Sequence, residues 1–247
     1  ASRTSILQAT TANAGNVIAN NIIKNHRLTE HTTNAAPALQ VLWSSGVLVA
    51  NNLFDSCWDG SILIQPDTPT ALSVADIDVI GNVIRNRQSL VSDIYIGENS
   101  VPTSYTTSRI RLKDNSLSSD WTKTSSGADI TIYNGTHIEL KNNTFYRTGV
   151  AGTNVFVIWG SNAAISASTD FDNCSAIDNR FIAEGSVLTD SRAIELVSDV
   201  DTGTSNHRFD NREHFGISST VTHNATPTNQ KLMVITDHFG CVVVTGA

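Results

Sequence analysis

The chain has little charge, few aromatic rings and no long apolar run. Of its 247 residues only 16% are charged, and the acidic residues outnumber the basic ones to give a formal net charge of -7. Proteins bind nucleic acids through Lys and Arg that displace counterions, so this balance argues against a nucleic-acid partner. No segment reaches the apolar length that spans a membrane and no signal peptide opens the chain, so we expect no membrane partner.

Metal-binding patterns are missing as well. The sequence contains neither a C-x-x-C nor an H-x-x-x-H spacing, so we expect no metal site and no cofactor. The three cysteines, Cys57, Cys174 and Cys241, are an odd number for a disulfide framework. Cys174 falls at an apolar position of the repeat described below, which favours a small core side chain over a ligand.

What the sequence does contain is a short phrase that returns at intervals of about thirty residues. It has the form x-h-x-h-x-[NDG]-N-x-h, where h is apolar, and it centres on an asparagine. This recurrent asparagine is Asn21, Asn52, Asn82, Asn115, Asn143, Asn179 and, more loosely, Asn211. Such a period predicts stacked repeats, because each unit is too small to bury its apolar face except against its neighbours.

The columns of the aligned phrases have distinct characters. Five and three residues before the recurrent asparagine the positions are almost wholly apolar, a separation of two that indicates a strand with one face turned inward. The residue just before it is always Asn, Asp or Gly, which tolerate a left-handed backbone, so we expect a sharp corner there. The recurrent asparagines should stack from coil to coil, each amide bonding the backbone and the next asparagine.

A second strand follows each corner after a loop of variable length. Its apolar residues again alternate, in the segments 61–65, 93–97, 129–133, 154–158 and 193–197. β-branched residues stacked coil upon coil form a narrow core, and helical periodicity is sustained nowhere. The sequence therefore predicts an all-β fold, a right-handed, single-stranded parallel β-helix (β-solenoid) of about seven coils.

The last segment differs from the repeat. Residues 1–211 form the predicted coils, and we expect them to be a fragment that lacks the usual N-terminal capping helix. Within residues 212–247, two apolar runs, KLMVI and CVVVT, flank a turn. They predict a short β-hairpin that caps the open end of the stack. A contact between the subunits of a trimer is the alternative for this segment.

The repeated phrase, which covers residues 14 to about 211, resembles that of the pectin-lyase-like right-handed parallel β-helices. This family includes pectate lyases, polygalacturonases, alginate epimerases and bacteriophage tailspike depolymerases. The polygalacturonase motif set is not matched, and neither the calcium-binding acidic cluster nor the catalytic arginine of pectate lyases can be placed. The chain is most similar to the tailspike subgroup, whose catalytic carboxylates vary in position. This resemblance implies a bacterial polysaccharide as partner, a homotrimer, and a location on a virion (phage tail) or at a cell surface.

Stacking turns the sequence into a map of the surface, because the same column of adjacent coils lies about 5 Å apart. The outward position before the second strand holds Asp93 and Asp129 in neighbouring coils. Like charges at that distance raise one pKa, and such a close pair suits a retaining glycosidase. We therefore expect catalytic carboxylates at Asp93 and Asp129, with Glu98 and Glu195 extending the acidic strip. Two solvated aspartates without a catalytic role are the alternative.

A second set of charges lies on the first strand. Six and four positions before the recurrent asparagine, successive coils present Asp76 and Asp78, then Arg109 and Arg111, then His137 and Glu139. These side chains either compensate one another on an exposed sheet or form a groove. In the groove, Arg109, Arg111 and His137 would bind an acidic sugar while His137 or a carboxylate moves a proton.

Exposed rings would add to sugar binding, since a flat ring packs on the C–H face of a pyranose. The rings that we expect outside the core are Tyr95, Tyr133, Phe156, Trp58, Trp121 and Trp159. Of these, Tyr95, Tyr133, Trp58 and Trp121 are candidates for substrate binding. The alternative for the two tryptophans is that they pack their loops onto the solenoid.

Three functions fit these residues. The first is a tailspike-like polysaccharide depolymerase domain, of the glycoside hydrolase or polysaccharide lyase class, which cleaves a bacterial surface glycan by carboxylate acid/base catalysis. The second is a non-catalytic glycan-binding or adhesin β-helix. The third is a uronate lyase or epimerase in which Arg109, Arg111 and His137 hold the carboxylate and shuttle the proton.

Overall fold

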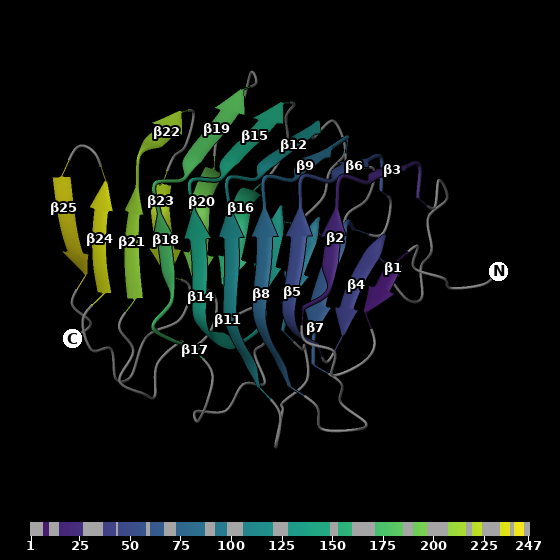
Figure 1. Cartoon of the computed structure of the whole chain (residues 1–247). Coiled ribbons are helices and arrows are strands. Elements are labelled where there is room, and N and C mark those ends of the chain that lie inside the picture. The colour runs from purple at the N-terminus through teal and green to yellow at the C-terminus, as the bar shows by residue number, and fades with distance from the viewer. Residues whose placement is uncertain are drawn as a thin grey trace.

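The structure is a computed structural model that describes residues 7–9, 15–26, 37–42, 44–57, 60–66, 73–86, 92–97, 106–120, 128–148, 153–159, 171–184, 190–196, 207–215, 219–223, 233–237 and 240–244. Within these segments every regular element is a β-strand and no helix occurs. The strands form three sheets around a common core, and each coil contributes a strand to each sheet in turn (Figure 1).

The three sheets divide the strands as follows. Sheet A contains β1 (Leu7–Ala9), β4 (Leu39–Leu42), β7 (Ile62–Gln65), β10 (Ile94–Ile96), β13 (Ile130–Ile132), β16 (Thr153–Trp159), β20 (Asp190–Leu196) and β23 (Ser219–His223). Sheet B contains β2 (Val17–Ala19), β5 (Ser45–Ala50), β8 (Val74–Ile80), β11 (Thr107–Lys113), β14 (Gly135–Lys141), β17 (Phe171–Asp172), β18 (Ser175–Ile177), β21 (His207–Asn211), β24 (Met233–Asp237) and β25 (Gly240–Val244). Sheet C contains β3 (Ile22–Lys24), β6 (Leu53–Asp55), β9 (Val83–Arg85), β12 (Ser116–Asp120), β15 (Thr144–Thr148), β19 (Arg180–Glu184) and β22 (Glu213–Phe215).

Strands at the same position of successive coils pair with one another. Ile94, for example, lies in register with Ile62 of the preceding coil and with Ile130 of the following one. All described pairings in sheets A and C are parallel. In Figure 1 the strands of sheet B stand side by side in a row, from purple β2 to yellow β25. The protein is therefore a parallel β-solenoid, as the repeat predicts.

The recurrent asparagines form the predicted ladder. Oδ1 of Asn115 accepts hydrogen bonds from the backbone N and the Nδ2 of Asn82, at 2.9 and 3.0 Å. Nδ2 of Asn115 donates to Oδ1 of Asn143 and to the carbonyl of Val79, both at 2.9 Å. Bonds from one asparagine to the next recur along the whole series. Because these buried amides have partners for their donors and acceptors, the ladder fixes the register of the coils.

The corner predicted before Asn211 is wrong, because Asp210 lies within β21 and its φ is not positive. A sharp corner precedes the other six recurrent asparagines, as predicted. The backbone angle φ is positive there, at 54° for Asn51, 64° for Gly81 and 57° for Asp114. A Cβ atom on Gly81 would lie 2.6 Å from Oδ1 of Asn51, so this corner requires glycine.

A second left-handed column lies in sheet B and was not predicted. Six positions before the recurrent asparagine, φ is positive at Gly15 (89°), Gly46 (65°), Asp76 (55°), Arg109 (53°), His137 (56°) and Asn173 (53°). Inward-facing residues of a strand normally lie two residues apart. At this column the spacing is three, since Thr107 and Ile110 are both buried. The paired strands all bend at this residue and stay in register across it, since Ser108 pairs with Ala75 and Ile110 with Ile77. The bend brings an extra side chain to the outer face.

The C-terminal segment contains the predicted hairpin. β24 and β25 pair antiparallel, with Met233 opposite Val244 and Asp237 opposite Gly240. β22, β23 and β24 still pair in parallel with the coil before them. Parallel stacking thus continues beyond residue 211, and among the described strands only β25 departs from it.

The core is apolar and partly aromatic. Phe156 and Trp159, predicted outside the core, are only 0% and 1% exposed, so the predicted exposure of both is wrong, although Trp159 does end strand β16 as expected. The ring of Phe156 packs edge-on against Phe145 and Phe181, with centroids 6.2 and 5.6 Å away, and Trp159 packs against Phe209 in the same way. The strand does not alternate at this point: both neighbours of Phe156 in the chain are buried with it.

Candidate functional site

Asp93 and Asp129 lie in adjacent coils, as predicted, but their side chains do not face solvent. Each residue is 1% exposed, and the backbone N of Asp93 donates to the carbonyl of Asp129 at 3.0 Å. The predicted outward orientation is therefore wrong. It came from continuing the strand alternation backward from Ile94 and Ile130, and this alternation does not hold at the corner where the chain enters sheet A.

Arg147, which sequence reasoning missed, is the ion-pair partner of Asp129. Its Nη2 lies 2.9 Å from Oδ1 of Asp129, and the two side chains are 3% and 1% exposed. Arg147 follows the inward Phe145 by two residues in β15, so the period of the strand alone predicts a cation in the core. The ion pair joins the end of a strand of sheet C to the corner before β13.

The other predicted carboxylates and tryptophans cannot be placed as side chains. Glu98, Trp58 and Trp121 lie outside the described residues. Glu195 lies in β20, in register with Ile158 of β16, and its side chain is outside the described part of the structure. The acidic strip is therefore not assembled among the described residues.

Tyr95 and Tyr133 stack on one another at the outer side of sheet A. Their ring centroids are 5.8 Å apart and the ring planes differ by 8°. Both residues are half-buried, and Oη of Tyr95 accepts a hydrogen bond from the backbone N of Ser92 at 2.9 Å. Because each ring covers a face of the other, the pair offers a sugar less open ring surface than two separate tyrosines would.

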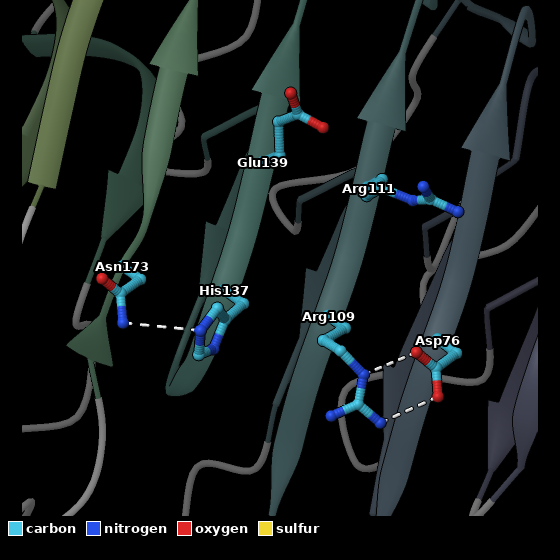
Figure 2. Close-up of a pocket in the computed structure, with 6 residues that line it drawn as sticks. All are labelled: Asp76, Arg109, Arg111, His137, Glu139 and Asn173. Carbon is cyan, nitrogen blue, oxygen red and sulfur yellow. Dashed lines mark hydrogen bonds and ion pairs between the residues drawn. The ribbon is translucent and has the colours of Figure 1, made fainter.

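The charged columns of sheet B do come together, in a pocket of about 360 Å³. It is lined by Asp76, Arg109, Arg111, His137, Glu139 and Asn173. These side chains project from β8, β11, β14 and the turn after β17, as Figure 2 shows. The pairing of Ile110 with Ile77 and Ile138 sets the register that aligns the columns. The sequence prediction that Arg109, Arg111 and His137 are neighbours is thus confirmed in position.

Ion pairs organise one side of the pocket. Nε and Nη2 of Arg109 donate to the two carboxylate oxygens of Asp76, at 2.6 and 2.8 Å (Figure 2). Arg111 binds Asp78 in the same two-pronged way. The hydrogen bond from Arg109 holds the pKa of the Asp76 carboxyl below its ordinary value, against a smaller opposing effect of burial. The same bond raises the pKa of Arg109, so this pair is fully ionised at neutral pH.

His137 lies on the other side of the pocket, beside a neutral partner. Its Nε2 is 3.4 Å from Nδ2 of Asn173 (Figure 2). Glu139, two residues further along β14, forms an ion pair with Lys113 of β11 at 2.8 Å. The pocket therefore combines two paired guanidinium groups, the carboxylates of Asp76 and Glu139, and an imidazole that forms no ion pair with a described residue.

A metal-binding cluster is not formed by the described side chains. Across these residues, no three or more His, Cys, Asp and Glu come together in a way that could hold an ion. None of the described segments is a helix long and apolar enough to cross a membrane.

Comparison with known proteins adds little to this geometry. No protein-family model matches the chain, and no curated protein matches it. One similar solved structure is the surface protein and adhesin PfbA of Streptococcus pneumoniae, which is 13% identical. The match covers 86% of this chain and 67% of that one, with a TM-score of 0.49. At this level of similarity we draw nothing about function from it.

Proposed function

We propose that this protein is a polysaccharide-binding β-solenoid that takes an acidic glycan on the outer face of sheet B, over the pocket between β8 and β14. Arg109, Arg111 and His137 supply hydrogen-bond donors for a carboxylate, and Asp76 and Glu139 supply acceptors for sugar hydroxyls. A sugar acid carries both kinds of group on one ring, so the mixed charge of the pocket suits it.

The observation that carries this proposal is the backbone of Arg109 and His137. Both are left-handed, whereas Gly15 and Gly46 occupy the same column in earlier coils. A left-handed backbone costs a residue with a Cβ atom about 1 to 2 kcal/mol, and such strain collects at functional sites. The presence of Arg and His at this column is explained if their side chains bind a ligand.

Charge compensation alone is the competing explanation. An exposed ion pair contributes about 0.2 to 1 kcal/mol, which does not exceed the backbone cost at Arg109. At His137 the explanation does not apply, because the side chain that it contacts, Asn173, is neutral. The magnitudes therefore favour binding.

Titration with fluorescently labelled oligogalacturonate tests the proposal, with dextran of similar length as the neutral control. We expect Arg109→Gly and Arg111→Ala each to weaken binding roughly tenfold, as the loss of a hydrogen bond from a charged group does. The matched control is Arg85→Ala, because Arg85 forms an exposed ion pair with Asp55 at 3.1 Å on sheet C, away from the pocket. Equal loss in all three variants, or no binding by the wild type, would overturn the proposal.

Removal of a proton from the bound sugar, as in a uronate lyase or epimerase, is a second candidate. It is favoured by the placement of His137 and Glu139 in the same pocket as the two arginines. In such a reaction His137 would take the proton next to the sugar carboxylate, while an arginine stabilises the developing charge. Ultraviolet absorbance of an unsaturated product would report lysis, and His137→Asn should abolish it. Epimerisation returns a proton to the same carbon and forms no unsaturated product, so exchange of that proton in deuterated water is measured as well. Binding with neither signal leaves the simpler binding function.

A more specific enzymatic proposal is that the protein hydrolyses a bacterial polysaccharide, as tailspike depolymerases do, with Asp93 and Asp129 as the catalytic carboxylates. Asp93 and Asp129 are each 1% exposed, so the corner around them would have to open before a polymer reached them. Release of reducing ends from a capsular or O-antigen polysaccharide would support this activity. Undiminished release by an Asp93→Asn, Asp129→Asn double variant would remove these two residues from it.

The tailspike resemblance extends the proposal to a right-handed winding of about seven coils, a homotrimer, and a location on a phage tail or a cell surface. Sedimentation equilibrium at several concentrations measures the assembly directly. A monomer at every concentration would remove the trimer from the proposal and leave glycan binding to a single chain.

A further inference from the structure

The acidic and basic side chains at the pocket, apart from His137, form pairs of opposite charge with no net charge. Each carboxylate has a basic partner of its own: Asp76 with Arg109, Asp78 with Arg111 and Glu139 with Lys113. His137 is the titratable side chain lining the pocket for which the described structure shows no ion pair. Its protonation state therefore decides whether this group of side chains is neutral or carries one positive charge.

The contact with Asn173 fits a neutral imidazole. Nδ2 of Asn173 carries only hydrogens, so its bond with Nε2 of His137, at 3.4 Å, requires Nε2 to accept. Protonation puts a hydrogen on Nε2, and two donors then face each other. Rotation of the Asn173 amide brings its Oδ1 to the ring and restores a hydrogen bond.

We infer that protonation of His137 strengthens the binding of an anionic glycan at this pocket, a regulation of the site that rests on the proposed function. An imidazole changes its charge between roughly pH 5 and 8, whereas the carboxylates of a polyuronate stay ionised over that range. The ligand charge is therefore constant while the pocket gains a cation. The pocket is open to solvent, and one added charge about 4 Å away in a medium as polar as water increases affinity roughly fivefold.

The arginines beside His137 keep their charge over this range. β11 presents Arg109 and Arg111, whose pKa values are raised by their hydrogen bonds to Asp76 and Asp78. β14 itself carries Glu139 and Lys141, and the turn after β17 carries the neutral Asn173. Asp172 of β17 pairs in register with Thr136, and its side chain is outside the described part of the structure.

Two substitutions of His137 separate the effect of its charge from the effect of its left-handed backbone, because both introduce residues that already occur in this column of sheet B. Asn173 and Arg109 both hold φ at 53° in this column, so His137→Asn and His137→Arg introduce residue types that this left-handed column accommodates. Binding of labelled oligogalacturonate is measured at about pH 5.5 and about pH 8, with dextran as the neutral control. Thermal unfolding of each variant at both pH values confirms that it is folded.

We expect wild-type affinity to be roughly fivefold higher at the lower pH. His137→Asn should bind weakly at both pH values and His137→Arg tightly at both. Binding of equal strength at the two pH values, or an acid enhancement that survives in His137→Asn, would overturn the inference and leave the proposed function standing. No binding by the wild type at either pH would overturn the proposed function, and the inference with it.

Discussion

Arg147 and Asp129 form an ion pair inside the solenoid, with Nη2 and Oδ1 2.9 Å apart. Nη2 of Arg147 also donates to the carbonyl of Val155 at 2.7 Å, and its guanidinium carbon lies 4.5 Å from the centre of the Phe156 ring. The cation is therefore bound by a carboxylate, a backbone carbonyl and an aromatic face. Arg147 belongs to β15 of sheet C, and it contacts the corner before β13 and strand β16, both of sheet A. The cation therefore holds sheets A and C together.

Removal of one partner of this ion pair should strongly destabilise the protein. Arg147→Met leaves the Asp129 carboxylate buried without its cation, and such a loss costs about 3 to 5 kcal/mol of unfolding free energy. Arg147→Met combined with Asp129→Asn should cost less than the sum of the two single changes. Urea denaturation measures this, with Arg85→Met as the exposed control, which we expect to lower stability by less than about 1 kcal/mol. Similar losses at the two arginines would contradict the structural role of the buried pair.

The stacked architecture was predictable because it follows from local rules that repeat. The column containing Asn115, the left-handed corner at Asp114 and the apolar alternation around Ile110 each indicate the same coil, and the structure contains all three. The orientation of Asp93 and Asp129 was not predictable in this way. Alternation applies to extended strands, and these two residues lie at a corner where the backbone turns.

The candidate site was predicted in position but not in conformation. The register of β8, β11 and β14 places Arg109 next to Asp76 and His137, as the aligned phrases predict. Their positive φ angles were not expected, because Arg and His seldom adopt them. Gly15 and Gly46, in the same column, were the signal in the sequence that a left-handed position lies there.

The asparagine ladder should depend on the buried asparagines and not on their exposed neighbours. Asn115→Gly removes two hydrogen bonds donated by its Nδ2 and leaves the amide groups of Asn82 without their acceptor. Unmet buried groups of this kind cost about 1 to 3 kcal/mol each, so we expect a loss of at least about 2 kcal/mol in urea denaturation. Asn142→Gly is the control, because Asn142 is exposed and left-handed at φ 55°. It should change stability by less than about 0.5 kcal/mol.

Cys57 should be unreactive in the folded protein. Burial is the main cause that raises the pKa of its thiol to about 12, so almost no thiolate, the reactive form, exists at neutral pH. Cys174, also buried, should behave likewise, as its predicted core position implies. In a Cys241→Ser variant, we expect iodoacetamide to label neither thiol until the protein is unfolded in urea, as mass spectrometry would show. Fast labelling of the folded variant would contradict the burial of both cysteines.

The ion pair between Asp76 and Arg109 should contribute stability only above acidic pH. The folded-state pKa of Asp76 is lowered from 3.8, mainly by the hydrogen bond from Arg109. A lowered pKa means that the contribution is present above the unfolded value and is lost as pH falls through the folded one. The wild type should exceed Asp76→Asn in unfolding free energy at neutral pH, by less than about 1 kcal/mol because the pair is exposed. This difference should vanish near pH 2, and a difference independent of pH would contradict the assignment.

Substitution at Arg109 should show that the backbone at the pocket is strained. Arg109 has φ 53°, a left-handed angle that glycine adopts without strain and alanine does not. We therefore expect Arg109→Gly to be about 1 kcal/mol more stable than Arg109→Ala. Arg111 is the matched control: it lies two residues along the same strand and is not left-handed. There the order should reverse, because glycine within an ordinary strand costs about 0.5 to 1 kcal/mol relative to alanine.

Urea denaturation of the four variants measures both differences, and oligogalacturonate titration of the same samples measures binding. If Arg109→Gly folds more stably than Arg109→Ala while both bind weakly, the arginine is retained at this column for its ligand and not for the fold. If alanine is the more stable residue at both positions, the strain is absent, and the strongest argument for a binding site on sheet B is lost.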